Sequence, residues 1–147
     1  MVNDHSRDPV ALANRLRPVL LTLNRELRRE AQTLGVTGGQ VSLLVAIRRF
    51  PGIGVRELAA RERISPAGMS GHVVRLAKAG LVERTPDAVD RRRHGLTLTA
   101  AGERVLRSVR SQRTAWLAAR LRALGPGELE ALDAAIEPLQ RLLEERA

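Results

Sequence analysis

Cysteine and tyrosine are absent from this 147-residue chain, and Phe50 and Trp116 are its only aromatic side chains. Without cysteine, disulfides, thiol redox sensing and cysteine-ligated zinc are excluded. So few aromatic rings argue against binding single-stranded nucleic acid by base stacking. No apolar run approaches the roughly 20 residues of a membrane span, and the polar start MVNDHSRDP lacks the apolar region of a secretion signal. These absences predict a cytoplasmic protein with no membrane partner.

Groups that perform chemistry in enzymes are also scarce. The three histidines, His5, His72 and His94, are scattered and have no carboxylate cluster beside them, so they predict no metal site. The chain has no glycine-rich phosphate loop, and no serine stands in a nucleophile motif with a histidine. The sequence therefore predicts a protein that is not an enzyme and that uses no cofactor.

Positive charge is the most abundant chemical feature of the chain. Twenty-five lysine and arginine residues against 16 acidic residues give a formal net charge of +9, with a pI of about 11.6. An excess of this size favours a polyanionic partner, most often nucleic acid. Only Lys78 is lysine, and an arginine- and alanine-rich composition also follows from a GC-rich genome. The positions of the arginines therefore have to decide between a nucleic-acid partner and a merely compositional excess of charge.

Both ends of the chain show helical periodicity. Asp8 and Pro9 suit the start of a helix whose apolar stripe is kinked by Pro18 and ends at Gly35. The residues of that stripe are Leu12, Leu16, Leu20, Leu23, Leu27 and Ala31. A second long helix is expected from Ala100 to Leu124, with Leu106, Val109, Leu117, Leu121 and Leu124 facing inward. A last helix starts near Pro126 and carries a heptad seam, interrupted by Pro138, of Leu129, Leu132, Ile136, Leu139 and Leu143.

The middle of the chain predicts three short helices followed by a hairpin. The first is capped by Thr37 and ends at FPGIG, residues 50–54, and the second is VRELAARER. Ser65 and Pro66 begin the third, which stops at Gly80. Residues 81–85 and 95–99 alternate as half-buried strands do, and the long loop between them should make the hairpin project. The order is that of a winged helix–turn–helix, so the expected fold is mainly α with a small β-hairpin wing.

The third of these helices corresponds to the helix that enters the DNA major groove in such a unit. Met69, Val73 and Leu76 form its buried stripe, and the opposite face carries small residues that let the backbone approach a duplex. On that face Ser70 can bond a base edge or a phosphate, and Arg75 can reach a phosphate or a guanine. An ordinary surface helix with one arginine explains this pattern about equally well.

The loop DAVDRRRH favours the DNA interpretation. Arg91, Arg92 and Arg93 at a hairpin tip can enter a narrow minor groove, where the negative potential is enhanced. Asp90 stands two residues before Arg92 and can accept from its guanidinium, which would hold that side chain in a pointing conformation. The alternative is a charged loop that only keeps the hairpin soluble. Because the loop stands where a wing belongs, we favour the DNA contact.

Three stretches, in order, resemble the MarR family of bacterial transcription regulators: VTGGQVSLLVAI, GVRELAARERISPAGMSGHVVRLAKAGLVER and DRRRHGLTLTAAG. Together they run from about residue 34 to residue 104, and the flanking helices fit the family in length and position. The resemblance implies a homodimer held by the N- and C-terminal helices and bound to a pseudo-palindromic operator in double-stranded DNA. It also implies a repressor that is often released by a small ligand bound between the dimer helices and the DNA-binding lobe.

The family's DNA contacts map onto single positions of this sequence. Asp90 and Arg92 match the Asp-x-Arg of the wing, while Ser70 and Arg75 match the contacts of the recognition helix. The residue after Ser70 is commonly arginine in the family and is Gly71 here, so the operator sequence cannot be taken from relatives. The complete predicted DNA-binding set is Ser65, Ala67, Gly68, Ser70, Gly71, Arg75, Asp90, Arg91, Arg92 and Arg93.

We expect three segments along the chain. Residues 1–34 form an N-terminal dimerisation helix with a polar leader, residues 35–99 the DNA-binding domain, and residues 100–147 the C-terminal dimerisation helices. The predicted function is a dimeric, sequence-specific transcription regulator, a repressor released by a small, partly apolar molecule such as a weak acid. The alternative is a winged-helix module that binds protein and has no operator, against which the arginines of the hairpin argue.

Overall fold

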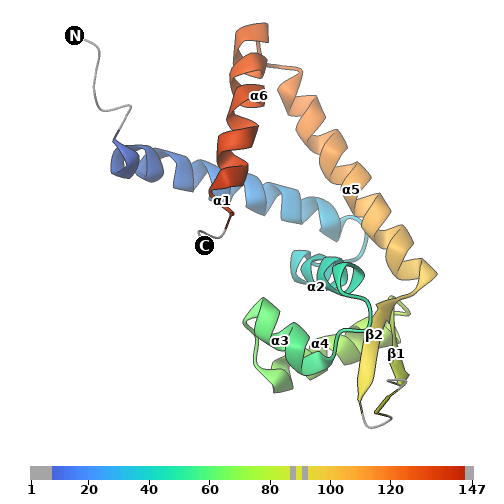
Figure 1. Ribbon diagram of the computed structural model, residues 1–147. Coiled ribbons are helices and arrows are strands. Elements are labelled where there is room, and N and C mark those ends of the chain that lie inside the picture. The colour runs from blue at the N-terminus through green and yellow to red at the C-terminus, as the bar shows by residue number, and fades with distance from the viewer. Residues whose placement is uncertain (1–7, 87–88, 91–92, 145–147) are drawn as a thin grey trace. The chain divides into compact units, whose positions relative to one another are not determined.

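The computed structural model describes residues 8–86, 89–90 and 93–144 (Figure 1). Its elements are α1 (Pro9–Gln32), α2 (Gly38–Arg49), α3 (Val55–Glu62), α4 (Pro66–Lys78), β1 (Val82–Pro86), β2 (His94–Leu98), α5 (Ala100–Leu121) and α6 (Pro126–Arg141). This order confirms the predicted fold class. The chain divides into two compact units, residues 1–113 and residues 114–147, so the boundary falls within α5.

The helix starts follow the local signals in the sequence. The Asp8 carboxylate accepts from the backbone N–H of Val10 and Ala11 at 3.2 and 3.3 Å. Thr37 and Gln40 form a reciprocal capping box, which satisfies two backbone donors at the start of α2. α1 continues unbroken through Pro18 and ends at Gln32, shortly before Gly35 turns the chain with φ +80°. These ends lie within a few residues of the predicted ones because each depends on a single capping or turn residue.

The core of the first unit lies among α2, α3, α4 and the base of the hairpin. All residues predicted to face inward on these three helices are buried: Val41, Leu44, Ile47, Leu58, Ala59, Met69, Val73 and Leu76. Each large aliphatic side chain stabilises the fold by about 1.5–3 kcal/mol when it is removed from water. This core fixes α4 against α3, so the outer face of α4 is presented on a packed support.

The hairpin pairs β1 and β2 in antiparallel register from Val82↔Leu98 to Pro86↔His94. Each strand is displaced by one residue from its predicted position. The expected half-buried alternation is wrong for most of β1, where only Val82 is buried. The reason is that a two-stranded hairpin that projects from its domain has little to pack against.

A third backbone segment, not predicted from the sequence, pairs with the base of the hairpin. The N–H of Gly52 donates to the carbonyl of Leu96 at 2.8 Å, and the N–H of Leu96 donates to the carbonyl of Ile53 at 2.9 Å. The approach is so close that a Cβ at Gly95 would lie 2.7 Å from the Gly52 carbonyl oxygen. Glycine is therefore required at position 95, and the hairpin is tied to the α2–α3 connection.

The start of α5 is bound to the end of α4. The Thr99 hydroxyl donates to the Gly80 carbonyl at 2.5 Å and accepts from the Gly102 N–H at 3.1 Å. A Cβ at Gly102 would overlap the carbonyl oxygen of Leu81. Further along α5, the Arg113 Nε donates to the carbonyl of Leu27 in α1 at 3.0 Å. Within the first unit, α5 is thus fixed both to the hairpin and to α1.

Leu117 was predicted to face inward but is exposed, and α5 ends at Leu121 rather than Leu124, which corrects both expectations. In α1, the stripe residues Leu12, Leu20 and Leu23 are exposed as well. No residue of α6 is buried, and its seam residues Leu129, Leu132 and Ile136 are 39–52% exposed. Within its own unit, each of these faces leaves aliphatic side chains exposed among the residues that the structure describes. Apolar faces of this extent are typical of interaction surfaces.

Across the residues that the structure describes, no helix has the length and apolar character to cross a membrane.

Candidate nucleic-acid interface

The outer face of α4 begins at a capped turn. Arg63 ends α3 in the left-handed region with φ +54°, and the Ser65 hydroxyl accepts from the Gly68 N–H at 3.1 Å. A residue other than glycine with this φ is uncommon, and here it directs the chain sharply from α3 into α4. The N-terminal turn of α4 is therefore free to present Ala67, Gly68 and Ser70, all of which are exposed.

Arg75 is the arginine on the predicted DNA-facing side of α4, and two neighbours set its position. Its Nη2 lies 2.9 Å from Nδ1 of His72, one turn earlier. Its Nη1 would be 3.7 Å from a Cβ at Gly71. His72 is half-buried and stands next to Val73 of the buried stripe in the sequence. The long side chain of Arg75 is thereby held along the helix surface by a contact that the sequence does not indicate.

The hairpin loop is described only in part. Asp90 forms an ion pair with Arg93, with 4.0 Å between Oδ2 and Nε, and the Arg93 N–H donates to the Asp90 carbonyl at 3.0 Å. The Arg93 side chain is 82% exposed. Arg91 and Arg92 lie outside the described residues, so the expected contact between Asp90 and Arg92 stays a prediction. An exposed pair at this distance contributes little to stability, and its effect is to orient Arg93.

These features define a surface with the chemical properties of a duplex-binding face. The N-terminal half of α4 offers small side chains and backbone that can approach a base edge. Exposed cations flank it in sequence: Arg63 in the preceding turn, Lys78 at the end of α4, and Arg84 and Arg93 on the hairpin. Cations of this kind contact phosphate and so position a protein on DNA. The residues that the structure describes contain no cluster of three metal-ligating side chains.

Ser65→Ala is expected to lower the free energy of unfolding by about 1 kcal/mol, because one N-terminal backbone donor of α4 loses its acceptor. Ser65→Asp should restore stability, since its carboxylate caps the helix and suits the helix dipole. The same carboxylate should weaken DNA binding by repelling phosphate. Thermal or urea denaturation and a DNA-binding titration measure the two effects. Ser70→Ala is the control, with stability expected to stay within about 0.5 kcal/mol; equal stability of Ser65→Ala and the parent protein would contradict the capping role.

A second charged feature is formed by residues of α1, α2, α3 and α5 and has no counterpart in any sequence motif. Arg28, Arg49, Arg61 and Arg113, from four different helices, line an open cleft of about 480 Å³. The Arg61 guanidinium stacks on the ring of Phe50 with 3.8 Å to its centroid. The pKa of Arg113 is lowered, first by burial and then by the positive charge of Arg28. Only packing brings these arginines together, so no spacing along the chain could have indicated the cleft.

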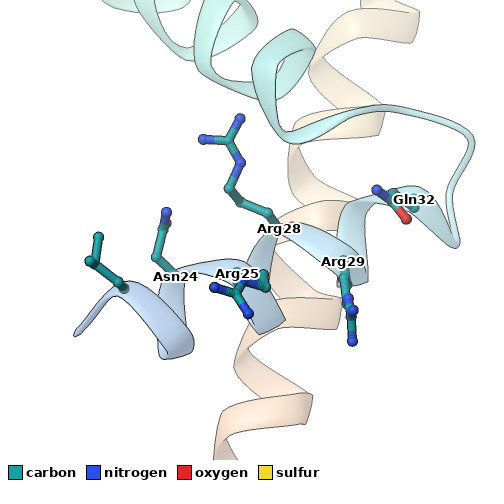
Figure 2. Close-up of a pocket in the computed structure, with 6 residues that line it drawn as sticks. Asn24, Arg25, Arg28, Arg29 and Gln32 are labelled. Carbon is teal, nitrogen blue, oxygen red and sulfur yellow. The ribbon is translucent and has the colours of Figure 1, made fainter. Parts of the chain in front are cut away.

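Arg28 belongs to this cleft and to a shallow groove along α1. Figure 2 shows its side chain extending from α1 toward α2, whereas Arg29 points away. At α2 the Arg28 side chain packs against Gly38, where a Cβ would come 2.5 Å from Nε. The other groove residues are Leu21, Asn24, Arg25, Arg29 and Gln32. The arginines of α1 therefore point to two different sides of the helix, with Arg28 toward α2 and Arg29 away from it.

Comparison with known proteins gives a consistent result. The MarR family model matches residues 34–93. An uncharacterised HTH-type transcriptional regulator of Mycobacterium bovis is 30% identical over 134 residues, covering 91% of this chain and 94% of the relative. The HTH-type transcriptional repressor MdtR of Bacillus subtilis is 29% identical over 114 residues, which cover 78% of this chain and 74% of MdtR.

Solved structures share the fold over nearly the whole chain. A crystal structure of a transcriptional regulator protein from Pseudomonas aeruginosa superposes with a TM-score of 0.81 at 34% identity, covering 93% of this chain and 96% of that one. A mutant of Staphylococcus aureus MepR bound to an oligodeoxyribonucleotide gives a TM-score of 0.70 at 18% identity, covering 90% and 98%. At that identity the second likeness concerns the fold alone.

Proposed function

Because the chain belongs to the MarR family of transcription regulators, we propose that it is a dimeric, sequence-specific repressor that binds duplex DNA and is released by a small anionic ligand. The observation that carries the DNA-binding part is the outer face of α4. Small exposed residues stand at its N-terminal end, Arg75 is held along its surface, and α4 is followed directly by a projecting hairpin whose tip carries Arg93. A helix at the base edges and a basic hairpin along the backbone are the two contacts that a winged helix makes with DNA.

The dimeric state is supported by the uncovered apolar faces. The stripe of α1 and the seam of α6 expose aliphatic side chains that a single chain leaves in water. A two-fold dimer places two copies of α4 on one side of a duplex, and two half-sites about one helical turn, some 10 base pairs, apart match that arrangement. A pseudo-palindromic operator follows from this symmetry.

Repression is proposed from the printed roles of related proteins. MdtR is named a transcriptional repressor, and MepR, whose mutant is seen with an oligodeoxyribonucleotide, is a regulator of a multidrug efflux pump. A protein that occupies an operator and is removed by a ligand blocks transcription until the ligand appears. We extend this behaviour to the present chain on the strength of the shared family.

The DNA-binding proposal is tested by selecting genomic fragments with the purified protein and footprinting the recovered DNA. We expect a protected site with two related half-sites, bound about 10³-fold or more tightly than random duplex at physiological salt. Equal affinity for all duplexes would reduce the protein to a nonspecific polycation. A complete lack of binding would favour the alternative, a winged-helix module that binds protein.

The cleft of Arg28, Arg49, Arg61 and Arg113 is the place where we expect the ligand. Its lining carries four cations and one carboxylate, that of Glu62, which accepts from the Ser42 hydroxyl at 3.2 Å. Burial and Arg28 together lower the pKa of Arg113, so an anion placed between the two guanidinium groups would relieve their repulsion. The ring of Phe50 adds an apolar wall. A small aromatic carboxylate has the charge and the shape for this site.

Ligand binding can reach the DNA-binding surface through Arg113. Its Nε donates to the carbonyl of Leu27, so it is part of the link between α5 and α1. An anion that draws the Arg113 guanidinium into the cleft would compete with this hydrogen bond and change how α5 meets α1. Such a ligand shifts the equilibrium only if it binds the arrangement that is unable to span two half-sites better than the competent one.

Arg113→Gln is expected to weaken binding of an aromatic carboxylate such as benzoate by on the order of tenfold, about 1.4 kcal/mol. The measurement is the ligand-induced rise in melting temperature, taken relative to each variant without ligand, together with ligand titration of the DNA complex. Arg110→Gln removes the same charge from an exposed position of α5 and should leave the ligand response intact. An equal loss in both variants would mean that only overall charge attracts the ligand, and a response to lipophilic cations alone would overturn the anion site.

A further inference from the structure

Arg75, Gly71 and His72 form a small arrangement on the outer face of α4 that DNA binding alone does not require. Nη2 of Arg75 lies 2.9 Å from Nδ1 of His72, and Nη1 would lie 3.7 Å from a Cβ at Gly71. We propose that His72 is a positioning residue, which accepts a hydrogen bond from Arg75 and holds its guanidinium over Gly71, aimed at a guanine in the operator. This inference rests on the proposed DNA-binding function and specifies which side chain sets its sequence preference.

The proposed hydrogen bond requires one particular tautomer of His72. A guanidinium carries only donors and stays protonated in proteins, so the nitrogen that faces it must accept. The proposal therefore assigns the imidazole proton to Nε2 and directs the lone pair of Nδ1 at Arg75. Because the guanidinium is planar, one hydrogen bond at Nη2 restricts the orientation of the whole fork. The remaining N–H groups are left to donate to O6 and N7 of guanine, the most frequent specific contact of arginine with a base.

Gly71 supplies the space for this arrangement. It lies toward the solvent side of α4, opposite Met69, Val73 and Leu76, yet it is half-buried. The Arg75 guanidinium covers Gly71, because its Nη1 is the atom that a Cβ at position 71 would meet within 4 Å. At 3.7 Å an alanine methyl fits in ordinary van der Waals contact, whereas a longer side chain would take the volume that the guanidinium fills. Glycine at position 71 thus leaves space for the guanidinium of Arg75, one turn later, to lie over the middle of the DNA-facing side of α4.

Preorganisation is the physical gain. An exposed arginine with free rotamers loses side-chain entropy when it docks, which costs about 0.5–1.5 kcal/mol for a rotamer-rich side chain. An arginine that is already held by His72 avoids part of that cost, but only at a base that suits the held orientation. The expected signature is therefore a loss of preference between operator and random duplex when His72 is replaced, with nonspecific affinity nearly unchanged.

The test uses the full-length protein and the operator recovered by selection, with random duplex of the same length as the reference. His72→Asn keeps an acceptor where Nδ1 stands and should bind the operator within about 2-fold of the parent, whereas His72→Leu should bind it about 10-fold more weakly. Random duplex should be bound within about 2-fold in both. Gly71→Ala should match the parent, and Gly71→Leu should resemble His72→Leu. In an Arg75→Ala background, His72→Leu should have no further effect, because the group that His72 positions is gone.

The outcomes separate this inference from the proposed function. If Arg75→Ala leaves operator binding unchanged, the major-groove contact proposed for Arg75 fails, whatever His72 does. If Arg75→Ala weakens binding but His72→Leu equals the parent, the positioning role is wrong and the proposed function stands. Should His72→Leu fail to fold, His72→Gln displaces the acceptor along the side chain and replaces it in the same comparison. Nitrogen NMR of the imidazole provides an independent check, since a proton found on Nδ1 would overturn the inference.

Discussion

Ile136→Asp is expected to convert the protein into a monomer and to weaken operator binding by more than about 100-fold. Ile136 is 52% exposed in the single chain and lies in the seam with Leu129, Leu132 and Leu139. In the monomer a carboxylate there costs little, because it remains in water. In an apolar interface it would have to be buried without a partner, which costs several kcal/mol per ion. A protein that can no longer hold two half-sites at once also loses the gain from simultaneous contact.

Ala134→Asp is the matched control for this variant. It introduces the same charge into the same helix, at an exposed position away from the seam, and it should leave both assembly and operator affinity in place. Sedimentation measures the mass and a gel-shift titration the affinity. Deleting residues 126–147 should likewise give a monomer or an insoluble chain. A seam variant that still sediments as a dimer and binds its operator normally would show that α6 does not hold the dimer.

Arg92→Ala should weaken operator binding by about 1–3 kcal/mol, as the loss of a groove contact does. It should also flatten the salt dependence, because each phosphate neutralisation that is lost removes about 0.9 from the slope of log affinity against log salt. Titrations at several salt concentrations measure both quantities. The fold should remain intact, because none of the core residues that the structure describes comes from positions 86–93.

Asp90→Ala distinguishes a structured wing from a merely charged loop. Asp90 pairs with Arg93 at 4.0 Å and is expected to hold Arg92 as well. Its loss should weaken operator binding even though the hairpin becomes more positive. Glu83→Ala removes an exposed carboxylate from β1 and should leave affinity unchanged or slightly higher. Tighter binding by Asp90→Ala would mean that the loop acts through its net charge alone.

Local signals in the sequence were sufficient for the helices and for the buried stripes of the DNA-binding domain. Asp8, Thr37 and Ser65 each cap a helix through their own side chain, and these caps depend on residues at most three positions away. The faces of α1 and α6 were harder, because periodicity identifies an apolar face but not what covers it. Leu12 and Ile136 repeat as regularly as Leu44 does, yet only Leu44 is buried by its own chain.

The candidate site was predictable in its positions and not in its contacts. Ala67, Gly68 and Ser70 are exposed on α4 as the helical period requires. The contact of Arg75 with His72 depends on the side-chain rotamers of both residues, which the sequence does not specify. The arginine cleft depends on the packing of four helices, and its members are spread from Arg28 to Arg113. Long-range convergence of this kind leaves no local signal.

The start of α5 is rigidly attached at Thr99, so a movement elsewhere in the helix also moves this end. Thr99 forms hydrogen bonds with both Gly80 and Gly102, and the Gly102 backbone lies directly against the Leu81 carbonyl. These contacts leave the start of α5 no room to move independently of the segment at residues 80–81. At 1.5 Å per residue, the segment from Thr99 to Arg113 is about 20 Å long. A tilt of about 5° would therefore displace one end by roughly 2 Å relative to the other. A displacement of α5 that begins at the cleft would therefore also displace the end of α4 and the base of the hairpin.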